Sequence, residues 1–98
     1  MTEIELLKKT APEVFESYIN TIKALQKRCP FDDKVKEFIL IAILTAKESE
    51  GGLNTHIQRA IKAGANEEEI LTVIISALPS CGIGSVMKGI RIAKKYFE

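Results

Sequence analysis

One seven-residue run, Phe38-Ile-Leu-Ile-Ala-Ile-Leu44, has no polar side chain and constrains the fold more than any other segment. By periodicity alone, so short an apolar run fits a buried strand or a buried helix. The flanking residues 34–37 and 45–48 extend it to the length of a helix, and no other segment has the pattern of a partner strand. We therefore predict a helix that is apolar on every face and lies at the centre of a bundle.

The rest of the chain also has the spacing and the capping residues of helices. Thr2 with Glu5 and Asn66 with Glu69 are capping boxes, and Pro12 fits the first turn of a helix. We predict helices from about Thr2 to Thr10, Pro12 to Cys29, Asp33 to Glu48, Leu53 to Ala63, Asn66 to Pro79 and Ile83 to Phe97, with a break at Gly51-Gly52. The apolar stripes predict these inward-facing residues in the last three helices: Leu53, Ile57, Ala60, Ile61; Ile70, Val73, Ile74, Ala77; Ile83, Val86, Met87, Ile90, Ala93, Phe97. The prediction is all-α, a compact bundle of five or six helices in one domain, residues 1–98.

Charge and length exclude several classes of partner. Fourteen Lys and Arg balance 13 Asp and Glu, which gives no basic excess for binding nucleic acid. No apolar run reaches the roughly 18–20 residues that cross a bilayer, and the acidic amino terminus does not resemble a signal peptide. We expect a cytoplasmic protein with no membrane partner, in which Cys29 and Cys81 are reduced thiols. Long apolar helices in 98 residues also predict burial against other copies of the chain, as a homo-oligomer.

His56 is the only histidine, and Glu37 begins the apolar third helix. Imidazole has an unperturbed pKa close to neutral pH, which makes it the first candidate for proton chemistry. On spacing alone, however, a packed histidine is the more common explanation for His56, and a solvated first-turn carboxylate is the more common one for Glu37. One histidine among scattered carboxylates lacks the clustered spacing of a zinc site, so we predict no metal.

A longer pattern carries a family resemblance. Glu37 and His56 are followed by Ala60, the turn Ala63-Gly64-Ala65-Asn66, the helix start Glu69-Ile70 and the segment Ser80-Cys81-Gly82-Ile83. In order and spacing this resembles the carboxymuconolactone decarboxylase and alkylhydroperoxidase-D family over roughly residues 30 to 97. The resemblance implies the orthogonal alkylhydroperoxidase-D-like bundle, and assembly as trimers or hexamers.

The family holds two chemistries, and two positions separate them here. The alkylhydroperoxidase-D branch uses a relay of Glu, two cysteines and His, and Glu37 and His56 fall on its first and last positions. Ser49 and Gly52 stand where the two cysteines would be. Peroxide reduction through a dithiol needs a thiolate that attacks and a thiol that resolves, so this chain lacks that chemistry. The segment from Glu50 to His56 instead resembles the decarboxylase branch.

The decarboxylase resemblance implies a lyase that needs no cofactor and acts on a small anionic organic substrate, a carboxylated lactone. His56 would be the general acid or base, and Glu37 would orient it or share its proton. Cys81 is a candidate for lining the substrate site and Arg59 for holding a carboxylate, although an inert core thiol and a solvated surface cation are the ordinary roles of such residues. The chain has glutamate at position 37 and Gly84 where decarboxylases often have other residues, which leaves the substrate open.

Two other functions remain compatible with the sequence. One is a peroxide-linked, peroxiredoxin-type redox protein that uses Cys29 and Cys81 in place of the missing pair. The other is an oligomeric binder of small molecules that has lost catalysis.

Overall fold

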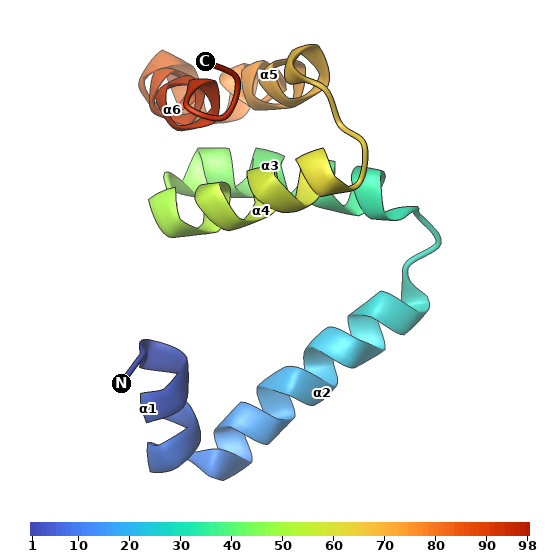
Figure 1. The fold of residues 1–98 in the computed structure, drawn as a ribbon, viewed down its shortest axis with the longest axis vertical. Helices are drawn as coiled ribbons and strands as arrows, with labels where there is room; N and C mark the ends of the chain where they lie inside the picture. The colour runs from blue at the N-terminus through green and yellow to red at the C-terminus, as the bar shows by residue number, and fades with distance from the viewer. The chain divides into compact units, whose positions relative to one another are not determined.

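The computed structural model describes residues 1–98, which form six helices and no strand (Figure 1). The all-α class and the number of helices are therefore confirmed. The helices are α1 (Glu3–Thr10), α2 (Pro12–Arg28), α3 (Asp33–Lys47), α4 (Glu50–Lys62), α5 (Glu67–Ser76) and α6 (Leu78–Lys94). None of them is long and apolar enough to span a bilayer. The chain divides into two compact units, Met1–Pro30 and Phe31–Glu98.

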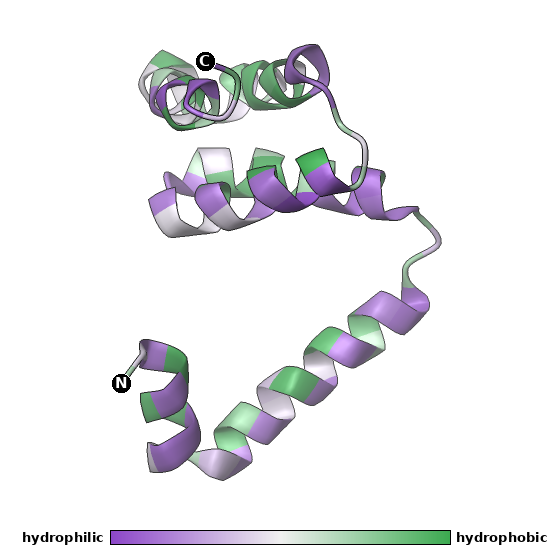
Figure 2. Cartoon of the chain, in the orientation of Figure 1, coloured by the Kyte–Doolittle hydropathy of each residue, from purple (hydrophilic) through white to green (hydrophobic).

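The first unit is the helical hairpin α1–α2, and its helix starts follow the predicted signals. The backbone N–H of Glu5 donates to Thr2 Oγ1 at 3.2 Å, which closes the predicted capping box, and Pro12 opens α2. Yet no residue of either helix is buried. Figure 2 shows apolar residues recurring along α2 between polar ones. The exposed apolar side chains of α2 are Val14, Tyr18, Ile22 and Leu25.

The second unit has two layers, α3 with α4 and α5 with α6 (Figure 1). Its core is aliphatic and draws on all four helices, through Ile41, Leu53, Ile57, Ala60, Ala65, Ile70, Ile74, Val86, Ile92 and Ala93. The predicted inward residues of α5 are confirmed at Ile70, Ile74 and Ala77, which are all buried. In α4, Leu53, Ile57 and Ala60 are buried as predicted, whereas Ile61 is 36% exposed.

Helix α3 is not enclosed on all sides. Within this chain only Ile41 and Thr45 of α3 are buried, while Ile39 and Ile43 are 44% and 50% exposed. Helices α4, α5 and α6 all contact α3, as expected of a central helix. They do not cover it on every face, and α3 keeps an exposed apolar face that includes Ile39 and Ile43.

Gly51 and Gly52 do not break the chain as predicted, because both lie in the first turn of α4. The break falls just before them. Glu48 adopts a left-handed conformation with φ of 54°, and Ser49 is the N-cap of α4, where its Oγ accepts the Gly52 N–H at 3.2 Å. A helix can start at two glycines when the preceding serine supplies the cap.

The buried face of α6 agrees only in part with the predicted stripe. Val86 and Ala93 are buried as predicted, whereas Ile83 and Met87 are exposed. Ser85, Gly89 and Ile92, which lie outside the predicted stripe, are buried as well. The chain kinks at Gly82, with φ of 82°, and Pro79 lies in the first turn of α6. A Cβ at Gly89 would lie 2.9 Å from Ile74 Cγ2 and 3.3 Å from Thr45 Cγ2. Helix α6 therefore buries the face with Gly89, on which Ile74 and Thr45 can pack closely, and exposes the more apolar face with Ile83 and Met87.

An ion pair joins the first turns of α3 and α5. Lys34 Nζ lies 2.9 Å from Glu69 Oε2, while Glu69 Oε1 accepts the backbone N–H of Asn66 at 3.0 Å and completes the second capping box. The hydrogen bond from Lys34, with that from Asn66, holds the pKa of Glu69 below its usual value of 4.5. Because the pKa of Glu69 is lower in the folded than in the unfolded chain, its ionised form stabilises the fold at pH values above the unfolded-state pKa. This contribution is lost as the pH falls through the folded-state pKa.

We therefore expect Glu69→Gln to lower the melting temperature at neutral pH and to match the wild type at acid pH, where both side chains are neutral. Glutamine retains the capping box, so the change removes only the charge. Thermal melts followed by circular dichroism across this pH range measure the difference. In a Lys34→Met background the neutral-pH effect should shrink, and an effect of unchanged size there would show that the ion pair is not its cause.

Candidate proton-transfer site

His56 and Glu37 form the closest polar contact between α3 and α4. Nδ1 of His56 lies 2.6 Å from Oε2 of Glu37, and the two side chains are only 19% and 15% exposed. Asp32 starts α3 by accepting the Val35 N–H at 2.9 Å, which places Glu37 in the second turn. The two-residue connection Glu48–Ser49 then reverses the chain, so that α4 runs back along α3 and brings position 56 opposite position 37.

This contact orients the imidazole. A carboxylate only accepts hydrogen bonds, so a neutral His56 ring that bonds to Glu37 carries its proton on Nδ1. This tautomer is assigned from the contact. Nε2 is then the ring nitrogen that can exchange a proton with a ligand. When Nε2 gains a proton, the carboxylate of Glu37 stabilises the imidazolium. The pair can therefore act as a general base and then return the proton as a general acid.

A peroxidase relay would carry cysteines at two positions between Glu37 and His56, and here Ser49 and Gly52 occupy them. Ser49 Oγ accepts the Gly52 N–H and caps α4, and Gly52 has no side chain. Glu48, the C-cap residue of α3, contacts α6. Its Oε2 accepts a hydrogen bond from Ser85 Oγ at 3.1 Å.

Cys81 and Arg59 occupy different surroundings. Cys81 is half-buried beside the core, and its Sγ donates at 3.2 Å to the carbonyl of Ala77, the N-cap residue of α6. Cys29 and Cys81 are both free thiols, and they belong to different units of the chain. Arg59 is exposed on α4, three residues after His56. The structure thus joins two of the four predicted site residues directly, while Arg59 lies on the same helix as His56 and Cys81 lies on α6.

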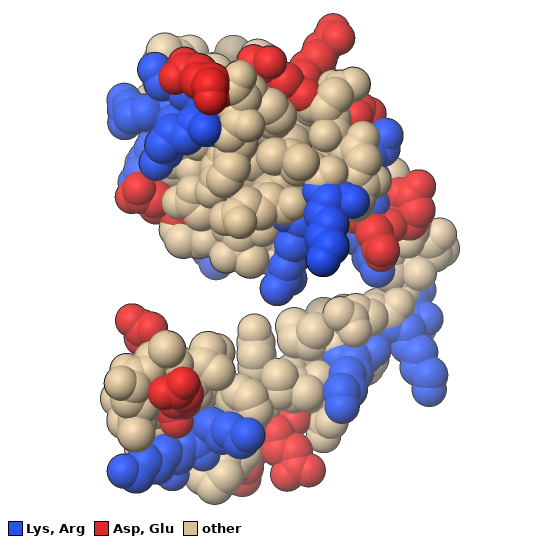
Figure 3. Space-filling view, viewed as in Figure 1, with Lys and Arg blue, Asp and Glu red and all other residues tan.

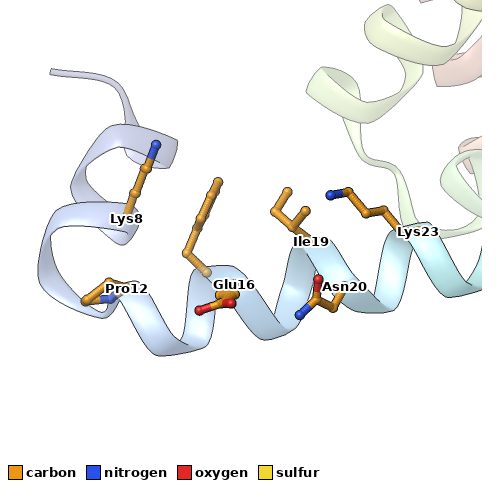
Figure 4. Close-up of a pocket in the computed structure, with 7 residues that line it drawn as sticks. Lys8, Pro12, Glu16, Ile19, Asn20 and Lys23 are labelled. Atoms are coloured by element: carbon orange, nitrogen blue, oxygen red, sulfur yellow. The ribbon is translucent and has the colours of Figure 1, made fainter.

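Other features do not form a competing site. No group of three or more His, Cys, Asp or Glu side chains could hold a metal ion. Acidic and basic side chains are both spread over the face shown in Figure 3. An open hollow lies on the α1–α2 hairpin (Figure 4), and it is lined by Lys8, Pro12, Phe15, Glu16, Ile19, Asn20 and Lys23. None of the predicted site residues lines it.

The chain belongs to the carboxymuconolactone decarboxylase family, whose sequence model matches residues 12–95. It is 25% identical over 87 residues to the uncharacterized protein MJ1511 of Methanocaldococcus jannaschii, an alignment that covers 89% of this chain and 81% of that protein. Its fold is similar to the crystal structure of apo-lpg0406, a carboxymuconolactone decarboxylase family protein from Legionella pneumophila. That comparison gives a TM-score of 0.81 at 24% identity and covers 98% of this chain and 88% of the other. The family match includes α2 and residues 31–95 of the second unit.

Proposed function

We propose that this protein is a cofactor-free lyase that decarboxylates a small carboxylated lactone, with His56 as the general acid–base residue. The observation that carries the proposal is the 2.6 Å contact between Glu37 and His56 in a chain of this family. Their low exposure and direct hydrogen bond favour a proton-transfer pair over a solvated carboxylate.

The chemistry requires one proton and no redox partner. The bond between the lactone carbon and its carboxylate breaks, carbon dioxide leaves, and the electron pair moves into the unsaturated lactone. A carbon of that conjugated system then takes up one proton, which protonated His56 supplies from Nε2. Glu37 holds the imidazole during this step and stabilises its charged form. In this proposal Arg59 pairs with a carboxylate of the substrate and Cys81 lines the site.

The proposal is tested by incubating the protein with a panel of carboxylated lactones and measuring release of carbon dioxide. Turnover of one of them supports a lyase. Consumption of a peroxide that depends on Cys29 and Cys81 would support the redox alternative. Binding of lactones without turnover would support the alternative of a non-catalytic binder.

We also propose that the protein works in the cytoplasm as a homo-oligomer, a trimer or a hexamer. Two free thiols suit a reducing compartment. The apolar side chains exposed on α2 and α3, which include Tyr18, Ile22, Ile39 and Ile43, suit burial between copies. We expect light scattering at micromolar concentration to give three or six times the 10.9 kDa mass of the chain, and a monomer would contradict this assembly.

A further inference from the structure

The space above Gly52 is filled by a neighbouring helix. A Cβ built on Gly52 would lie 2.6 Å from Leu44 Cδ2 and 2.8 Å from Ser49 Oγ, closer than real Cβ atoms approach other heavy atoms. Leu44 of α3 therefore occupies the place of a side chain at position 52. The preceding Gly51 differs sharply, because a Cβ there would meet nothing within 4 Å.

This contact and the proton-transfer pair both lie in the interface between α3 and α4, which we call the seam. Leu44 follows Glu37 by two helical turns in α3, and Gly52 precedes His56 by one turn in α4. Side chains on a helix lean towards its N-terminus, so we expect the His56 side chain to lean over the turn that contains Gly52. The δ carbons of Leu44 occupy the surface that glycine leaves bare in that turn. A side chain at position 52 would displace Leu44 from the seam.

We propose that Gly52 is a positioning residue for the Glu37–His56 pair, because its missing side chain lets Leu44 close the seam between α3 and α4 beside the imidazole. An effect of Gly52 on catalysis rests on the proposed lyase function. Its effect on the hydrogen bond between His56 Nδ1 and Glu37 Oε2 does not, since that bond can be observed without a substrate.

The test compares Gly52→Ala with Gly51→Ala in protein labelled with ¹⁵N at histidine. Both changes place alanine in the first turn of α4, so they alter helix propensity alike and differ in the contacts that a Cβ at position 52 makes with Leu44 and Ser49 Oγ. In the wild type the Nδ1 proton should resonate downfield, because its hydrogen bond is short. We expect Gly51→Ala to preserve this signal and Gly52→Ala to move it upfield or broaden it beyond detection.

A second variant links the effect to Leu44. Leu44→Ala removes both δ carbons, so adding Gly52→Ala in that background should leave the Nδ1 signal close to that of Leu44→Ala alone. If Gly52→Ala by itself does not fold, this pair of variants gives the answer, since the overlap with Leu44 is absent and only the approach to the Ser49 hydroxyl remains. A clear difference between the two would show that Leu44 is not the cause and would overturn the inference.

Activity gives a separate outcome. If the protein turns over a lactone, Gly52→Ala should lower kcat/KM by about 10²-fold, the typical effect of a displacement of about 1 Å in a catalytic group. Gly51→Ala should retain the wild-type value. If no lactone is turned over, but Gly52→Ala changes the Nδ1 signal and Gly51→Ala does not, the lyase proposal fails and the positioning role stands. Identical Nδ1 signals in Gly51→Ala and Gly52→Ala would mean that Leu44 simply rotates away, and the positioning role would be wrong.

Discussion

Replacing His56 by alanine is expected to lower kcat/KM for a carboxylated lactone by about 10²–10⁴-fold, the usual contribution of a general acid–base residue. The change removes Nε2, which exchanges the proton, and leaves the Glu37 carboxylate without the partner that it holds at 2.6 Å. Steady-state kinetics of carbon dioxide release measure the loss. A His56→Ala variant with full activity would exclude the proposed mechanism.

Two conservative variants separate chemistry from packing. In His56→Asn the amide nitrogen can donate to Glu37 in place of Nδ1, yet the group at Nε2 is absent, so the protein should fold and remain inactive. In Glu37→Gln the side-chain oxygen can still accept from Nδ1, but it carries no charge to stabilise an imidazolium. We expect its activity to lie between those of the wild type and His56→Ala. An inactive Glu37→Gln beside an active His56→Asn would reverse the assigned roles.

The largest expected effect on stability comes from Ile57, which is fully buried in the core of the second unit. Ile57→Ala should destabilise the fold by about 2–5 kcal/mol, because it removes apolar contacts and leaves a cavity. For a chain of this size the melting temperature should fall by on the order of 10 °C or more.

Ile61, one turn further along the same helix, is the matched control. Its side chain is 36% exposed, so Ile61→Ala should cost less than about 1 kcal/mol. Chemical denaturation of the two variants compares them directly. Equal losses would mean that Ile61 is buried in solution, as the apolar stripe in the sequence suggested, for instance against another copy of the chain.

Local signals were enough to predict the number of helices and the starts of α1, α2 and α5, but not the starts of α4 and α6. The capping boxes at Thr2 and Asn66 and the proline at position 12 fix helix starts through contacts within four residues, and all three are present in the structure. Glu37 and His56 were paired only through the family pattern. Nothing in their separation of 19 residues requires contact, because that depends on how sharply the chain turns at Glu48–Ser49.

The predictions that failed concern the buried face of α6 and the break at Gly51-Gly52. In both cases close packing between helices, and not the apolar pattern of one helix, decides the structure. The choice of the Gly89 face of α6 over Ile83 and Met87 depends on Ile74 and Thr45, two side chains that lie on other helices. Gly52 was interpreted as a helix breaker for the same reason, since its close contact is with Leu44, a side chain of another helix. A single helix wheel contains no information about either partner. Glycine at a close contact and glycine at a break look alike in the sequence.

The most direct test of the proton-transfer site compares three proteins in one assay for carbon dioxide release and peroxide consumption. These are the wild type, His56→Ala and Cys29→Ser, which removes one of the two thiols that the redox alternative requires. The predicted result is lactone decarboxylation by the wild type and Cys29→Ser, with a loss of about 10²–10⁴-fold in His56→Ala. Peroxide consumption that persists in His56→Ala and disappears in Cys29→Ser would contradict it.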